Sequence, residues 1–237
     1  MELEVFYPKP DELVQQEINV LDFLRNNTYI KEKHSEFARD VGAYYTRNRG
    51  TDAGFEFFSH LDVSHDQSRT AAPNLRLILA ARILRNKQAY SDVTYCLCVC
   101  RTRNLAVLRK FHFDVTITTG DRSRTQPQPR SHIQYCGTMI PQMSQMGVRP
   151  GQLLPMNPWL SEPRILAWPM SLALLLDMAL REFPNAKSER FRAMPEWRKI
   201  VRDHESLLLL PFLEQCTKVI KNTSGCRQTL SDAMYVG

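Results

Sequence analysis

The run KFHFDV, residues 110–115, places an imidazole and a carboxylate two residues apart. In an extended strand alternate side chains point to opposite faces, so His112 and Asp114 would share one face and the aromatic residues the other. The run SHIQ, residues 131–134, repeats the pattern with His132 and Gln134. If the two strands pair, the two imidazoles and the carboxylate meet on one polar face.

Two imidazoles suit acid–base chemistry on a phosphodiester, because one can take the proton from an attacking hydroxyl while the other protonates the leaving oxygen. The segment between the two runs carries Arg122, Arg124 and Arg130, and arginine charge stabilises the negative charge that develops on phosphorus. We therefore predict a catalytic set of His112, Asp114 and His132, with these arginines on phosphate.

The same residues allow other interpretations. His112, Asp114 and His132 could instead hold a divalent metal ion. They could also form a solvated polar sheet face with no chemistry, because His-x-Asp and His-x-Gln are common pairs. The sequence leaves all three open, and the cofactor is unknown.

A nucleic-acid partner fits the charge of the chain. The formal net charge is +6, and the pI is near 9.1. Arginine predominates among the basic residues and makes forked contacts with phosphate. We predict a helix over 74–87 that adds Arg76, Arg82 and Arg85 to a nucleic-acid surface, and we also expect a protein partner.

The remaining cysteines and histidines predict no further site. Cys96, Cys98 and Cys100 alternate along one strand, which predicts a buried face of small thiols and not a metal site, because no CxxC spacing occurs. His204, within RDHES, is expected on an exposed helical face.

Absent motifs remove several enzyme classes. The chain has no GxGxxG, GxxxxGK[ST], GxSxG or HExxH, which argues against the common nucleotide-binding, serine-hydrolase and zinc-protease classes. The first residues, MELEVFYPKPDE, do not resemble a secretory signal, and no apolar run is long enough to cross a bilayer. We expect a cytoplasmic protein without a membrane partner.

The composition, 43% hydrophobic and 24% charged, is that of a globular protein. Helices are predicted over 11–26, 32–48, 74–87 and 170–183 and from 195 onward, and strands over 92–101, 105–118 and 131–137. This order predicts an α+β fold in which flanking helices pack on a small central antiparallel sheet. We expect one domain over 1–237, with a helical part over 1–90 and the sheet and C-terminal helices over 91–237.

Three runs together resemble a bacterial family, domain-of-unknown-function family 2290. They are HFDVTIT (112–118), QPQPRSHIQYCG (126–137) and EPRILAWPMSLALLLDMALREFP (162–184), and they lie within a span of about a third of the chain. The resemblance implies a bacterial cytosolic protein of mobile elements, toxin–antitoxin loci or phage-defence islands. It draws interest to Asp114 and His132 but gives neither a role, and the segment 141–158 departs from the pattern.

We predict that the protein is a component of a bacterial antiviral defence or toxin–antitoxin system and acts on nucleic acid as a phosphodiester-cleaving nuclease. The alternative is a non-catalytic binding or adaptor subunit of a larger nucleic-acid-associated complex. The sequence does not decide whether the protein is an enzyme.

Overall fold

The computed structural model describes residues 7–27, 54–63, 75–86, 89–101, 107–115, 128–129, 131–135, 164–184, 186–222 and 235–236. Within 54–63 it describes the backbone alone. The helix predicted over 32–48 lies outside the described residues.

A six-stranded sheet with the order β1-β2-β3-β4-β6-β7 organises the described chain. Its strands are Gly54–Val63 (β1), Leu75–Asn86 (β2), Ala89–Arg101 (β3), Val107–Val115 (β4), Ser131–Tyr135 (β6) and Arg164–Leu166 (β7). Each strand runs antiparallel to its neighbours. A separate pair joins Gln128–Pro129 (β5) to Tyr235–Val236 (β8). The predicted α+β fold is confirmed, with a larger sheet than expected because β1 and β2 extend it.

The helix predicted over 74–87 is wrong, because this segment forms strand β2. Leu77, Leu79, Ala81 and Ile83 pack on one side of the sheet, while Ile78 and Ala80 are buried on the other. A central strand buried on both faces reads as a nearly continuous apolar run, which resembles a buried helix when its residues are Leu and Ala. The expected helical part over 1–90 therefore contains two strands.

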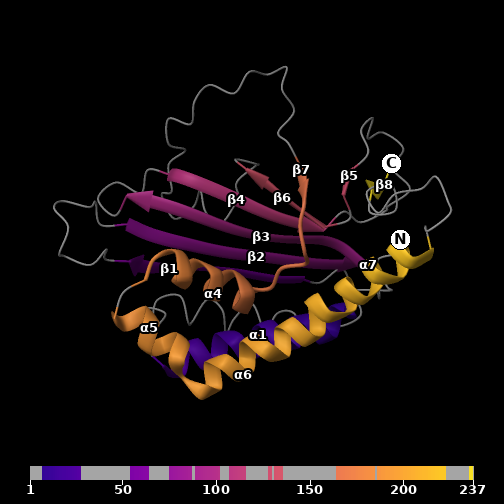
Figure 1. The fold of residues 1–237 in the computed structure, drawn as a ribbon. Helices are drawn as coiled ribbons and strands as arrows, with labels where there is room; N and C mark the ends of the chain where they lie inside the picture. Colours follow the sequence, from indigo (N-terminus) through magenta and orange to yellow (C-terminus); the bar gives the residue numbers. More distant parts are fainter. Residues whose placement is uncertain are drawn as a thin grey trace.

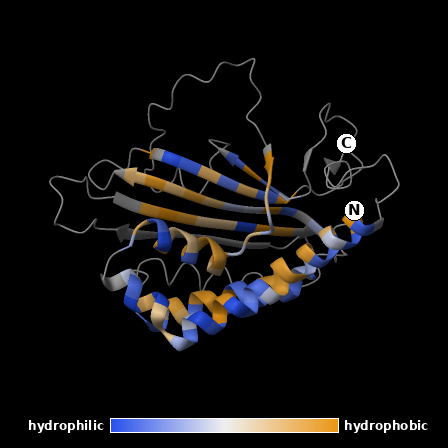
Figure 2. Ribbon diagram, viewed as in Figure 1, coloured by the Kyte–Doolittle hydropathy of each residue, from blue (hydrophilic) through white to orange (hydrophobic). Residues whose placement is uncertain are grey.

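The helices lie on one side of the sheet (Figure 1). They are Pro10–Asn26 (α1), Leu172–Glu182 (α4), Ala186–Ala193 (α5), Pro195–His204 (α6) and Leu210–Asn222 (α7), with the π-helical turn Glu205–Leu209 (η2) between the last two. The helices predicted over 11–26, over 170–183 and from 195 onward are confirmed. Hydrophobic and hydrophilic residues alternate along α6 and α7, as expected for helices with a buried stripe (Figure 2).

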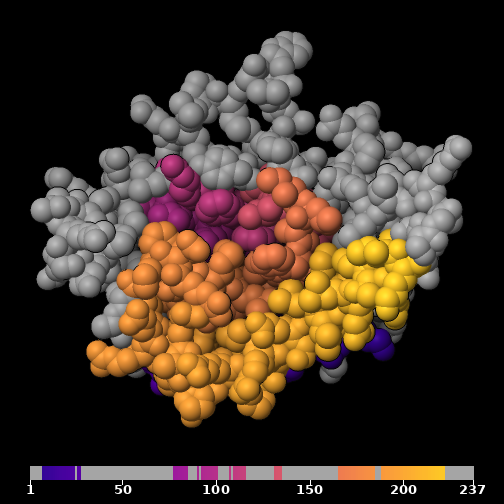
Figure 3. Space-filling model, in the orientation of Figure 1, coloured from indigo at the N-terminus to yellow at the C-terminus, as the bar shows by residue number. Residues whose placement is uncertain are grey.

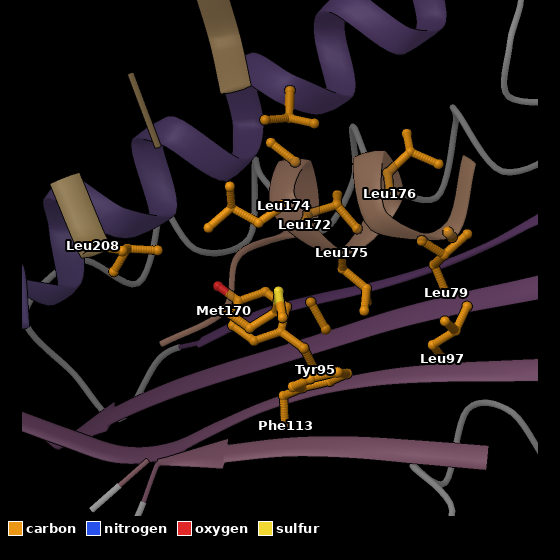
Figure 4. Close-up of a cluster of buried hydrophobic side chains, with 14 of the residues drawn as sticks. Leu79, Tyr95, Leu97, Phe113, Met170, Leu172, Leu174, Leu175, Leu176 and Leu208 are labelled. Atoms are coloured by element: carbon orange, nitrogen blue, oxygen red, sulfur yellow. The ribbon is translucent and has the colours of Figure 1, made fainter. Parts of the chain in front are cut away.

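The main core fills the space between sheet and helices (Figure 4). Tyr95 and Leu97 of β3 face the leucines of α4, and Trp197 of α6 is fully buried with them. The even-numbered cysteines of β3 point to the side of the sheet opposite α4. These residues, Cys96, Cys98 and Cys100, form a second buried cluster with residues of β2 and β4. The predicted buried thiol face is therefore confirmed. We call this side of the sheet, opposite the described helices, the far face.

A buried carboxylate joins α1, β3 and α4. Glu17 accepts a hydrogen bond from the Tyr95 hydroxyl at 2.6 Å, and its two oxygens accept the Leu172 N–H at 3.1 and 3.2 Å. Leu172 opens α4, whose unpaired N–H groups favour an anion. Burial nevertheless raises the pKa of Glu17 from 4.5 to about 7, against the lowering effect of these bonds.

A second carboxylate ties α4 to α5 and α6. Asp177 accepts from Trp197 Nε1 at 3.1 Å and from Arg192 Nε at 3.0 Å, and pairs with Arg181 at 2.8 Å. Burial acts to raise the pKa of Asp177, but these bonds outweigh it and lower the pKa below 3.8. Asp177 is therefore a charged anchor of the helical layer.

Pro211 accounts for the π-helical turn between α6 and α7. A proline has no N–H to donate, and in an α-helix its ring would clash with the carbonyl four residues earlier. In the wider turn the Leu210 N–H donates to the Glu205 carbonyl instead. The extra residue rotates α7 by about 100° about its axis relative to α6, so the run of leucines in η2 and α7 does not face the core as one stripe.

Candidate functional site on the far face

Strands β4 and β6 pair as the site prediction requires. Asp114 lies directly opposite His132, and His112 lies opposite Gln134. Directly paired residues of an antiparallel sheet point to the same face, so His112, Asp114 and His132 share the far face. His132 Nε2 lies 3.8 Å from Asp114 Oδ2, which is ion-pair contact but longer than a hydrogen bond.

The expectation of a solvated polar face is wrong. His112 and His132 retain only 5% and 4% of their surface, whereas the side chain of Asp114 retains 22%. Interactions between charges and dipoles are stronger in such surroundings than in water, because the effective dielectric constant is lower. The carboxylate is therefore the more accessible end of the group.

The polar row continues into the neighbouring strands. Thr94 of β3 lies opposite Asp114, and Arg82 of β2 lies opposite Thr94. The Arg82 guanidinium pairs with Asp92, and the Thr94 hydroxyl donates to Asp92 Oδ1 at 3.1 Å. Arg82 thus lies on a sheet row two strands from Asp114 and not on a helix surface.

The other predicted nucleic-acid contacts are not brought to this site by the described structure. Arg76 and Arg85 belong to strand β2 and not to a helix, and their side chains are not among those described. Arg122, Arg124 and Arg130 lie outside the described residues. Their predicted role on phosphate stays a prediction.

Thiols and a lysine continue the far face beyond His112. Cys96 lies opposite His112, Cys98 lies opposite the buried Lys110, and the Sγ atoms of the two cysteines are 3.9 Å apart. The contact with Cys96 and burial raise the pKa of the Cys98 thiol, although the Lys110 charge lowers it. This raised pKa argues against Cys98 as a nucleophile, because the thiolate is the reactive form.

The metal alternative gains no support from the described residues. They contain no group of three or more His, Cys, Asp and Glu side chains placed to hold a metal ion.

The exposed helical position predicted for His204 is wrong. The side chain is almost fully buried at the end of α6, and neither ring nitrogen has a hydrogen-bond partner. Burial lowers the pKa of His204 from 6.5 to about 4, although Asp203 raises it. Sequence reasoning missed this residue because its neighbours in the run RDHES are polar. The apolar residues that share its face, Val201 and Leu208, lie three and four positions away and were the available signal.

Comparison with known proteins adds no identity. No protein-family model, curated protein or solved structure matches this chain. Within the part of the chain that the structure describes, no helix combines the length and apolar character needed to cross a membrane.

Proposed function

We propose that the far face carries the active site of a phosphodiester-cleaving enzyme that acts on nucleic acid. The observation that supports this most directly is the cross-strand pair of Asp114 and His132, with His112 on the same face. A carboxylate that orients an imidazole is the usual companion of a general base. In this proposal His132 is the base, Asp114 orients it and His112 is the acid.

The sheet geometry suits a phosphate between the imidazoles. His112 and His132 are diagonal neighbours across β4 and β6, a relation that separates backbones by about 7–8 Å. A phosphate group fits such a span, with the attacking hydroxyl on the side of His132 and the leaving oxygen on the side of His112. His132 would take the proton of the attacking hydroxyl, and His112 would return a proton to the leaving oxygen.

The biological setting rests on the resemblance to the bacterial family of unknown function and on the basic charge of the chain. We propose a cytoplasmic component of a bacterial defence or toxin–antitoxin system. Arg122, Arg124 and Arg130 precede β6 in the chain and would supply contacts to the phosphate backbone.

The direct test is cleavage of labelled single- and double-stranded RNA and DNA by the full-length chain. His132→Gln and His112→Gln should each lower the cleavage rate by about a hundredfold or more, as expected for an acid–base group. Asp114→Asn should lower it less, because Asp114 acts through His132. The matched control is Gln134→Ala, which alters the same strand and face and should leave the rate within a few-fold.

The melting temperature of each variant should be measured by circular dichroism as a control for folding, because His112 and His132 are buried and their replacement affects packing. A wild-type chain that cleaves none of the four substrates refutes the enzymatic proposal. Full activity in a folded His132→Gln variant refutes the assignment of the base.

The burial of both imidazoles favours a second candidate, a non-catalytic binding or adaptor subunit. In that case the His132–Asp114 contact is part of the sheet's internal packing. The expected result is nucleic-acid binding without cleavage, with an affinity that falls steeply as salt rises. Nucleic-acid binding by a wild-type chain that cleaves none of the four substrates would support this candidate over the first.

A further inference from the structure

Five large hydrophobic side chains are exposed within the described part of the chain, with 53% to 61% of their surface accessible. They are Ile165, Trp168, Leu210, Leu213 and Ile220. They belong to two segments only, the edge strand β7 with the turn after it, and helix α7. We call these five side chains the α7 patch.

Helix α7 carries three of them in a stripe. Leu210, Leu213, Thr217 and Ile220 are separated by three, four and three residues and are all exposed. This spacing is that of the seam between two paired helices. Phe212, on another side of α7, is buried in the main core, so the core contacts a different side of this helix from the exposed stripe.

The two segments adjoin. Met170, which follows Trp168 in the chain by two residues, belongs to the same buried cluster as Leu208 at the end of η2 (Figure 4). In the space-filling view the atoms of the β7 segment, in darker orange, lie against the yellow atoms of α7 (Figure 3). In this view the two segments that carry the exposed residues are neighbours at the surface of the molecule (Figure 3).

The size of the patch is that of an interface core. At roughly 100 Å² each the five side chains expose about 500 Å², which lies within the range of about 300–600 Å² for the largest apolar patch of a typical monomer, a patch that is often functional. A standard interface buries about 800 Å² on each partner, and about 65% of a homodimer interface is apolar. The patch and a polar rim thus match one half of a dimer interface.

The charges on α7 specify the partner. Glu214 lies in its N-terminal half, and Lys218 and Lys221 lie in its C-terminal half. Antiparallel contact with a second α7 brings each acidic half toward the basic half of the other helix and also opposes the helix dipoles. Parallel contact would align like charges. We propose that the α7 patch binds the same patch of a second copy of this chain, with the two α7 helices antiparallel about a twofold axis.

The test is the mass of the full chain by light scattering over a range of micromolar concentrations. A dimer of twice 27.5 kDa is expected, and Leu213→Glu or Ile220→Glu should convert it to a monomer. The matched control is Asn19→Glu, which adds the same charge at an exposed position of α1 and should leave the dimer intact. Unchanged melting temperatures would show that the variants remain folded.

A charge exchange tests the orientation. Glu214→Lys and Lys221→Glu should each weaken the dimer several-fold, and the double variant should restore most of the loss. A wild-type monomer at every concentration overturns the proposal, whether or not the patch binds a different protein or a vesicle surface. A dimer that persists in both Leu213→Glu and Ile220→Glu also overturns it.

Discussion

Replacing Glu17 by glutamine tests the reasoning about the helix layer most sharply. The carboxylate is fully buried, and its pKa is raised from 4.5 to about 7. Below pH 4.5 the group is protonated in both the folded and unfolded chains, so its contribution to stability is fully present. As the pH rises through about 7, the unfolded chain has released the proton and the folded chain must ionise at a cost.

The size of the effect follows from the shift. About 2.5 pKa units at 1.36 kcal/mol each give about 3 kcal/mol of stability lost between pH 4.5 and pH 8. Glutamine does not ionise, so Glu17→Gln should lack this loss. Its amide carries two N–H donors in place of the single O–H of the protonated carboxyl group, and the extra buried donor should cost about 1–2 kcal/mol at every pH.

The assay is urea unfolding of both proteins at several pH values between about 4.5 and 8, at one protein concentration because association would add to stability. The difference in unfolding free energy should favour wild type at low pH and shift toward the glutamine variant by about 3 kcal/mol at high pH. A difference that stays constant with pH would show that Glu17 does not carry a raised pKa. A shift in the opposite direction would show that the hydrogen bonds dominate over burial.

Four further outcomes are expected. Burial lowers the pKa of His204 to about 4, so the contribution of the neutral imidazole to stability is complete above pH 6.5. This contribution falls by about 3 kcal/mol as the pH drops through 4. Urea unfolding of His204→Leu should lack that acid-dependent loss. Asp177→Asn should cost about 3 kcal/mol in thermal unfolding, because it weakens a buried hydrogen-bonded ion-pair network that includes Trp197 Nε1. Asp203→Asn, which loses only an exposed pair, should cost under about 0.5 kcal/mol. Mass-spectrometric alkylation should label the three β3 cysteines only after unfolding, since all are fully buried.

The sequence predicts a segment's secondary structure well when its apolar residues repeat with the period of a strand or of a helix, and poorly when they do not. Strand β3 was predicted because tyrosine, threonine, valine and cysteine alternate within it, and these residues favour strands. Strand β2 was not, because Leu and Ala favour helices and both of its faces are buried. Its identity depends on pairing with β1 and β3, which is tertiary information.

For the candidate site, too, some features follow from the sequence and others depend on tertiary packing. That His112, Asp114 and His132 share a face follows from the two-residue period of strands, and the pairing of β4 with β6 follows from their order in the chain. That the imidazoles are buried does not follow, because burial depends on what lies over a sheet face. The burial of Glu17 was not predicted for a similar reason. A glutamate on a helix is usually exposed to solvent, and its burial here depends on the packing of α4 and Tyr95 against α1.

The buried polar groups on the two sides of the sheet differ in a way that bears on function. On the helix side, Glu17 and Asp177 accept hydrogen bonds at 2.6 to 3.1 Å from tyrosine, tryptophan and arginine donors, as expected where a buried polar group stabilises the fold. On the far face the Thr94 hydroxyl also donates to Asp92 at 3.1 Å, but the pair His132 and Asp114 approaches only to 3.8 Å. A contact that serves stability gains most at hydrogen-bonding distance, whereas catalytic groups are often spaced more loosely before substrate binds. The far face is therefore where a search for activity should begin, and the variants of His132 and His112 carry more information about function than any substitution in the helical layer.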